Sequence, residues 1–233
     1  MMKIKPEISG VSIVLVGSFN PPIFHPEWFE RHGLINDKEK EAAEIAIIHR
    51  QIAAFRMEWL AINIEPVRFV AETQEGPFIR LADFVVKTFK DYLYHTPIGM
   101  MGINRQVHFS VGSEEERNRI GKMLAPHEGW GEWGKDLEGK SPKKRGGMIS
   151  LTMLQQDLDD RKKGYIKAKI EPSNKIKDNA GIDMEVNDHY EVENPAQNQD
   201  CKELMDILES KFDNSIKHSE WIIDQIMKLT DIK

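Results

Sequence analysis

The feature that most constrains the fold of this chain is residues 101–111, where apolar and polar side chains alternate. The apolar set is Met101, Ile103, Val107, Phe109 and Val111, and the other set is Gly102, Asn104, Gln106, His108 and Ser110. Side chains of a β-strand point alternately to opposite faces, so this stretch predicts a strand with one apolar and one polar face. Such a strand is typical of a sheet that is covered on one face.

Further strands and helices follow from the same kind of reasoning. Strands are predicted at residues 11–16, 51–64, 67–73, 148–156, 165–171 and 181–192. Helices are predicted at 37–49, capped by Asn36 or Asp37, at 81–93, at 114–124 with Ser113 as the cap, and at 200–231. Residues from about 126 to 147 are rich in glycine and lysine and are expected to form a flexible basic loop.

These elements predict an α+β fold. We expect a mostly antiparallel sheet of about six to seven strands, with helices on one face and a long C-terminal helix. No shift in composition marks a boundary, so residues 1–233 are expected to form a single domain. The order of elements suggests topological halves, 1–98 and 99–233, although the halves share no sequence identity.

A proline-rich stretch follows the first strand. Residues 17–29 contain three prolines and four large aromatic side chains, at Phe19, Phe24, Trp28 and Phe29. Proline removes backbone donors and disfavours helix, so we expect a rigid, extended loop. Phe24 and Trp28 are predicted to be buried against the core, and a partner-binding surface is the alternative.

Composition excludes some classes of function. The 233 residues carry a formal net charge of −6, which argues against broad, sequence-independent binding of nucleic acid. The single cysteine, Cys201, allows no internal disulfide and is expected to be inert. The first residues lack the apolar segment of a signal peptide, and no apolar run is long enough to span a bilayer. We therefore expect a cytoplasmic protein that does not bind membranes.

Several short motifs occur in a fixed order along the chain. They begin with Gly17-Ser18-Phe19-Asn20-Pro21 and Pro26-Glu27-Trp28-Phe29, continue through Gly102-Ile103-Asn104 and Gly164-Tyr165-Ile166, and end with Asn187-Asp188-His189-Tyr190. In these motifs the sequence resembles a sporadically distributed, uncharacterised bacterial family. The resemblance implies no defined activity. A patchy distribution is typical of genes in mobile elements, defence islands and toxin–antitoxin modules, which is an association only.

One stretch fits the letters of a phosphate-binding loop. Residues 134–141 match the pattern G-x-x-x-x-G-K-[ST], but the flanking residues predict neither the strand nor the helix that such a loop requires. A weak anion-binding patch is the more modest interpretation, made of Lys140, Lys143, Lys144 and Arg145. The histidines show no metal-binding spacing and the cysteine is unpaired, so no metal or cofactor is predicted.

The best candidate binding residues lie on two predicted strands. Asn104, Gln106 and His108 share one face of the first strand, and Asn187 and His189 share one face of the second. If both strands turn these faces the same way, the side chains line a binding groove. The alternative is that they bond within the sheet or face solvent. With Asp188 nearby, the histidines would also suit acid–base chemistry.

These observations lead to three hypotheses of function. The leading one is a non-catalytic binding or interaction protein, such as an antitoxin, chaperone or adaptor in a bacterial defence or mobile-element module. The alternatives are a hydrolase or nuclease-like enzyme using His108, His189 and Asp188, and a nucleotide or nucleic-acid binder using residues 135–145. The expected partner is another protein or a second copy of the chain. Because the end of the last predicted helix is unusually apolar, we expect a homodimer or a tight complex through residues about 216–229.

Overall fold

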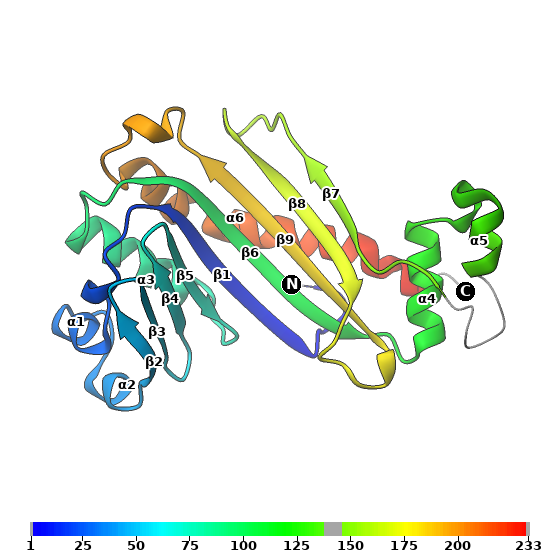
Figure 1. Cartoon of the computed structure of the whole chain (residues 1–233), viewed down its shortest axis with the longest axis horizontal. Helices are drawn as coiled ribbons and strands as arrows, with labels where there is room; N and C mark the ends of the chain where they lie inside the picture. Colours follow the sequence, from blue (N-terminus) through cyan, green and yellow to red (C-terminus); the bar gives the residue numbers. More distant parts are fainter. Residues whose placement is uncertain (1, 138–145, 232–233) are drawn as a thin grey trace.

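The strands form one antiparallel sheet in the order β2-β3-β4-β5-β1-β6-β9-β8-β7 (Figure 1). The computed structural model describes residues 2–137 and 146–231. The nine strands are β1 Ile8–Gly17, β2 Glu44–His49, β3 Ile52–Arg56, β4 Ala61–Glu65, β5 Arg68–Thr73, β6 Ile98–Ser110, β7 Leu151–Gln155, β8 Gly164–Pro172 and β9 Gly181–Glu191. The α-helices are α1 Pro26–Arg31, α2 Asp37–Glu41, α3 Ile79–Lys87, α4 Glu114–Leu124, α5 Gly131–Leu137 and α6 Lys202–Met227. The predicted α+β class is confirmed.

Helices α3 and α6 cover one face of this sheet. Helix α3 packs on β1 and β5, and the long helix α6 crosses β6 and β9. Both lie behind the sheet in Figure 1, while the face toward the viewer carries no helix. The strands show the matching pattern, because alternate residues such as Val11, Ile13 and Leu15 of β1 are buried beneath the helices. The sheet therefore has a covered face and an open face.

The covered face holds two hydrophobic clusters with a buried charge between them. On β6, Ile103 belongs to the first cluster and Val107 belongs to the second. Arg105, which lies between these two residues on the same face, is only 1% exposed. Its guanidinium donates to the Gly10 carbonyl (3.0 Å) and lies 3.4 Å from the Glu220 carboxylate of α6. A polar contact thus divides the core where α6 passes over the middle of the sheet.

The order of strands repeats on either side of the central β1–β6 pair. One side continues through β5, β4, β3 and β2, and the other side continues through β9, β8 and β7. Each of these runs is followed along the chain by a helix on the covered face, α3 after β5 and α6 after β9. The second run has one strand fewer than the first.

Two sequence-based element assignments in the first run are wrong. The helix predicted at 37–49 ends at Glu41, and residues 44–49 instead form β2. Asn36 and Glu39 do form the reciprocal cap that starts α2, but the β-branched residues that follow are better suited to a strand paired with β3.

The strand predicted at 51–64 is two strands, β3 and β4, joined by a tight turn. The Met57 N–H donates to the Leu60 carbonyl (2.7 Å), and the turn residues Met57, Trp59 and Leu60 are buried. A turn of apolar residues continues the alternation, and that is why the sequence pattern missed it. With these two corrections the sheet has nine strands, where six to seven were predicted.

The proline-rich stretch is helical in part, contrary to expectation. It holds a 3-10 turn at Pro21–Ile23 and the helix α1, which begins at Pro26. Proline is tolerated in the first turn of a helix because that N–H has no intrahelical acceptor. Phe24 is 1% exposed within the first cluster, and Trp28 is half-buried against it. The predicted packing against the core is confirmed for Phe24 and holds in part for Trp28.

The region predicted as a loop from 126 to 147 also contains helices. Residues His127–Trp130 form a 3-10 turn and residues Gly131–Leu137 form α5. Residues 138–145 lie outside the described part of the chain. The remaining predicted elements occur near their expected positions, including the Ser113 cap of α4, whose hydroxyl accepts from the Glu116 N–H at 3.1 Å.

The apolar end of α6 is covered in part by its own chain. Ile223 and Met227 are buried in the second cluster, together with residues from the N-terminus, α4 and β7. Part of the apolar surface at residues 216–229 is therefore taken up within the subunit, while Trp221 stays 56% exposed. Association into a homodimer or a tight complex through residues about 216–229 stays a prediction. Within residues 2–137 and 146–231, no helix has both the length and the apolar composition needed to cross a membrane.

Candidate functional site

The structure brings five of the predicted binding residues onto the open face of the sheet. In the β6–β9 pair, Asn104 lies opposite Asn187 and Gly102 lies opposite His189. Opposite residues of an antiparallel pair share a face, so the polar sides of these two strands coincide. Gln106 and His108 continue the same row along β6. The polar faces of the two strands therefore point the same way, which the sequence alone left undecided.

This row borders a shallow hollow of about 350 Å³. The hollow extends across five strands and is lined by Ser12, Val14 and Val16 of β1, Arg68, Val70 and Glu72 of β5, Met101, Gly102 and Asn104 of β6, Glu185, Asn187 and His189 of β9, and Tyr165 of β8. The β1–β5 side carries three valines beside Arg68 and Glu72, and the β6–β9 side carries the amides of Asn104 and Asn187. It offers both an apolar strip and hydrogen-bonding groups to a ligand.

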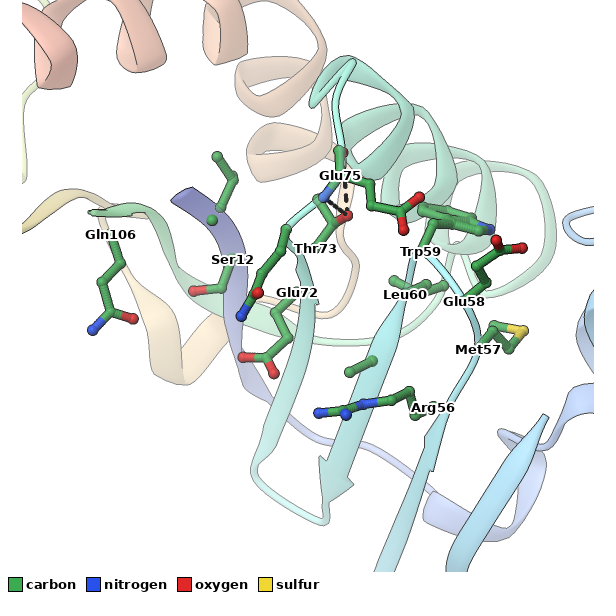
Figure 2. Close-up of a pocket in the computed structure, with 14 residues that line it drawn as sticks. Ser12, Arg56, Met57, Glu58, Trp59, Leu60, Glu72, Thr73, Glu75 and Gln106 are labelled. Carbon is green, nitrogen blue, oxygen red and sulfur yellow. Dashed lines mark hydrogen bonds between the residues drawn. The ribbon is translucent and has the colours of Figure 1, made fainter. Parts of the chain in front are cut away.

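Two neighbouring hollows share residues with the first. One, of about 260 Å³, lies between the β3–β4 turn and the end of β5, and shares Ser12 and Glu72 (Figure 2). The other, of about 670 Å³, lies over β2 to β5 and shares Arg68 and Glu72. In Figure 2 the Arg56 side chain extends toward the Glu72 carboxylate. Glu72 lines all three hollows, and we call the three together the open-face groove.

The amide pair at the floor of the groove is incompletely bonded. Asn104 is 6% exposed, and its Nδ2 donates to the Ser12 hydroxyl at 3.2 Å. The Oδ1 atoms of Asn104 and Asn187 are buried and accept no hydrogen bond from the described residues. Gly102 leaves the space that the Asn187 amide occupies, since a Cβ at this position would lie 3.2 Å from the Asn187 Nδ2. Buried acceptors of this kind are costly unless a ligand or water supplies a donor.

An aromatic stack stands at the far side of the groove. The rings of Tyr165 and His189 are parallel within 16°, with centroids 4.4 Å apart. Burial lowers the pKa of His189, and the nearby Glu191 carboxylate opposes this shift only in part. The imidazole is therefore neutral near pH 7, so His189 adds a flat, uncharged surface to the groove.

The charges of the groove are mostly acidic. Its lining includes two arginines, Arg56 and Arg68, and five glutamates, at positions 44, 58, 72, 75 and 185. The side chains of Arg56, Arg68 and Glu72 are exposed and form no hydrogen bond or ion pair with other described residues. They are available to a ligand that carries both signs of charge.

His108 lies in a separate, packed environment at the end of the row. It is 1% exposed, its Nδ1 is 2.8 Å from the Ser173 hydroxyl, and its Nε2 is 3.7 Å from the Asp183 carboxylate. Burial lowers the pKa of His108 although Asp183 favours the charged form. Ser173 is itself buried, and its oxygen accepts from the Lys175 N–H at 3.1 Å. A substrate has no access to this hydroxyl, so the cluster fits a structural role.

Sequence reasoning missed Ser173 and Asp183, and no local signal marks them. The sequence separation of Ser173 from His108 is 65 residues, and only the pairing of β8 and β9 with β6 brings them together. Gln106 also belongs to this cluster, since its Nε2 donates to the Asp183 carboxylate at 3.1 Å.

Asp188 faces the covered side of the sheet, away from His189. Its carboxylate pairs with Arg161 and accepts from the Tyr190 hydroxyl at 3.1 Å. His189 lies opposite Gly102, six positions along β6 from His108, or roughly 20 Å at the rise of a strand. The structure therefore does not assemble His108, His189 and Asp188 into an acid–base site.

The other candidate residues fall away from the groove. Phe24 belongs to the core and is not accessible to a partner. Trp28 lies in a small aromatic cluster, 4.4 Å from the His32 ring. Lys140, Lys143, Lys144 and Arg145 lie outside the described residues, and Gly134 and Lys135 before them are part of α5.

Cys201 is buried at the start of α6, with its sulfur 3.3 Å from the Tyr94 carbonyl. Burial raises the pKa of the Cys201 thiol to about 11, so the thiol is protonated at neutral pH and unreactive. Among the described side chains, no group of three or more His, Cys, Asp and Glu is placed to hold a metal ion.

Comparison with known proteins gives no assignment: no family model matches the chain, and no curated protein shows significant sequence similarity to it. The resemblance to a sporadic bacterial family therefore stays a prediction.

Proposed function

We propose that this chain is a non-catalytic interaction protein that binds an extended polypeptide segment in the open-face groove. The observation that carries the proposal is the amide pair of Asn104 and Asn187 at the floor of the groove, whose Oδ1 atoms accept no hydrogen bond from the described residues, so that a turn of either amide would present an acceptor to a ligand. A polypeptide backbone supplies N–H donors at regular spacing, which suits two acceptors on neighbouring strands.

The remainder of the lining supports the same class of ligand. Val14, Val16 and Val70 provide an apolar strip for side chains of the bound segment, and Val16 is 39% exposed without a ligand. Arg68 and Glu72 offer one charge of each sign beside this strip. A nucleic acid is disfavoured, because five glutamates against two arginines repel a phosphate backbone.

The proposal is tested with a displayed library of random peptides, selected on the parent protein. The double variant Asn104→Leu/Asn187→Leu keeps the shape of both side chains and removes both acceptors. We expect selected peptides to bind the double variant roughly tenfold or more weakly, since each lost hydrogen bond costs about 0.5–1.5 kcal/mol. Asn214→Leu, on the solvent side of α6, is the matched control and should bind as the parent does.

Folding of the double variant is checked by its melting temperature. The unbonded acceptors contribute nothing to stability, but Asn104→Leu also removes the bond from the Asn104 amide to the Ser12 hydroxyl, so the double variant should lose about 1 kcal/mol and stay folded. Selection of no peptide at all, or of peptides that bind the parent and the folded double variant equally, would refute the proposal.

A further inference from the structure

Strand β2 forms an edge of the sheet and, among the described strands, pairs only with β3. All six of its residues are exposed, and three are large and apolar: Ile45 (50%), Ile47 (43%) and Ile48 (38%). The outer N–H and C=O groups of such a strand can pair with another strand. Natural edges are usually protected by lysine or proline, and residues 44–49 contain neither.

A bulge sets which side chains of β2 share a face. Ile45 lies opposite Phe55 and Ile47 lies opposite Ala54, so Ala46 is an extra residue. Ile45 and Ile48, opposite the buried residues Phe55 and Ala53, are on the covered side of the sheet. Glu44, Ile47 and His49 are on the open side, with Arg56, Ala54 and Ile52 as their partners.

This arrangement makes β2 complementary to a second copy of itself. Two β2 strands can pair antiparallel about a twofold axis perpendicular to the sheet. This symmetry places the open faces of both copies on one side of the joined sheet and the covered faces on the other. With Ala46 opposite Ile47 of the other copy, Ile45 meets Ile48 on the covered side and Glu44 meets His49 on the open side. Without the bulge, residues at an odd separation would fall on opposite faces, and this register would be forbidden.

We propose that two copies of this chain form a homodimer through antiparallel pairing of their β2 strands in this register. The occupant is a second copy because apolar residues meet apolar residues, and a carboxylate meets an imidazole, at every symmetric position of the same six residues. The two sheets join into one, and the two open-face grooves lie on the same side of it. Pairing of one short strand buries a modest area, so the dimer is expected to be weak, with a dissociation constant in the micromolar range.

The association is measured by light scattering and sedimentation of the full chain over a range of concentrations. Ile47→Lys should abolish the dimer, because it places two lysines near the twofold axis. Met153→Lys is the matched control, since Met153 is 65% exposed on β7, the opposite edge, and this variant should dimerise as the parent does.

The register is tested by replacing the facing side chains of Glu44 and His49. His49→Glu places two glutamates opposite each other at two symmetric positions and should weaken the dimer roughly ten- to a hundredfold. Glu44→Lys/His49→Glu places a lysine opposite each glutamate and should recover affinity to within about tenfold of the parent. All three β2 variants change exposed side chains, and circular dichroism confirms that they stay folded.

Hydrogen exchange of the parent gives a measurement that needs no variant. The amides of residues 44–49 should become more protected as the protein concentration rises. The proposal is overturned by a chain that stays monomeric at every concentration, by a dimer that Ile47→Lys leaves intact, or by a dimer that the double exchange does not restore.

Discussion

Replacement of Arg105 by alanine should be among the most destabilising single changes on the covered face. The guanidinium is 1% exposed and donates to the Gly10 carbonyl (3.0 Å), the Gln106 carbonyl (3.1 Å) and the Ser9 hydroxyl (2.9 Å). It also pairs with Glu220 and lies over the Phe78 ring, 4.9 Å from the ring centroid. Burial lowers the pKa of Arg105, which shows that the charge pays a desolvation cost that these contacts must offset.

The magnitude follows from the contacts that are lost. Three hydrogen bonds at about 1 kcal/mol each, with the packing of the buried stem, approach the range of about 3–5 kcal/mol measured for breaking a buried ion pair. The Glu220 side chain is 16% exposed and so partly solvated in the variant. We therefore expect a loss near the lower end, about 3 kcal/mol.

Urea unfolding at neutral pH measures this loss from the midpoint and slope. Arg68→Ala is the control, because Arg68 is exposed and has no polar partner in the described chain, and it should change stability by less than about 0.5 kcal/mol. Arg105→Met should lose less than Arg105→Ala, because an apolar side chain can join the two clusters. A loss below about 1 kcal/mol for Arg105→Ala, or equal losses for both variants, would show that the buried contact is not a determinant of stability.

Two further predictions concern stability. The pKa values of His108 and His189 are lowered by burial, so the unfolded state binds protons more readily than the folded state does. The free energy of unfolding should therefore fall as pH drops from about 7 to 5, by up to about 1.4 kcal/mol per pH unit for each histidine. Urea melts at several pH values should show a shallower fall for His108→Gln than for the parent. The same dependence of unfolding free energy on pH in both proteins would contradict this prediction. Phe24→Ala should cost about 3–5 kcal/mol and Trp28→Ala clearly less, because Phe24 is fully buried and Trp28 is not; thermal or urea melts that rank the two the other way would contradict the packing described here.

Local pattern was sufficient for elements that have one dominant period. Residues 101–111 and 181–192 alternate cleanly, and they are β6 and β9 in the structure. The apolar spacing of the last helix and the Ser113 cap of α4 were equally readable. In these segments the period of the strand or helix places the apolar side chains on one face, so the spacing of residues close in sequence is enough to predict the element.

Pattern failed where a local signal had two solutions. Residues 44–49 suit a helix by their alanine and strand pairing by their isoleucines, and β3 decides in favour of the strand. Pro26 reads as a helix breaker in isolation but begins α1, because its place in the first turn removes the cost.

The candidate site shows the same division. The sequence determined that Asn104, Gln106 and His108 share a face, as do Asn187 and His189, since this follows from the period of a strand. Only the tertiary structure decided that β6 and β9 are neighbours with Asn104 opposite Asn187, that His108 is enclosed by Ser173 and Asp183, and that Asp188 turns to Arg161 on the other side. The reason is that strand order and register depend on pairing between residues far apart in the chain, and a period within one strand carries no information about which strand lies beside it.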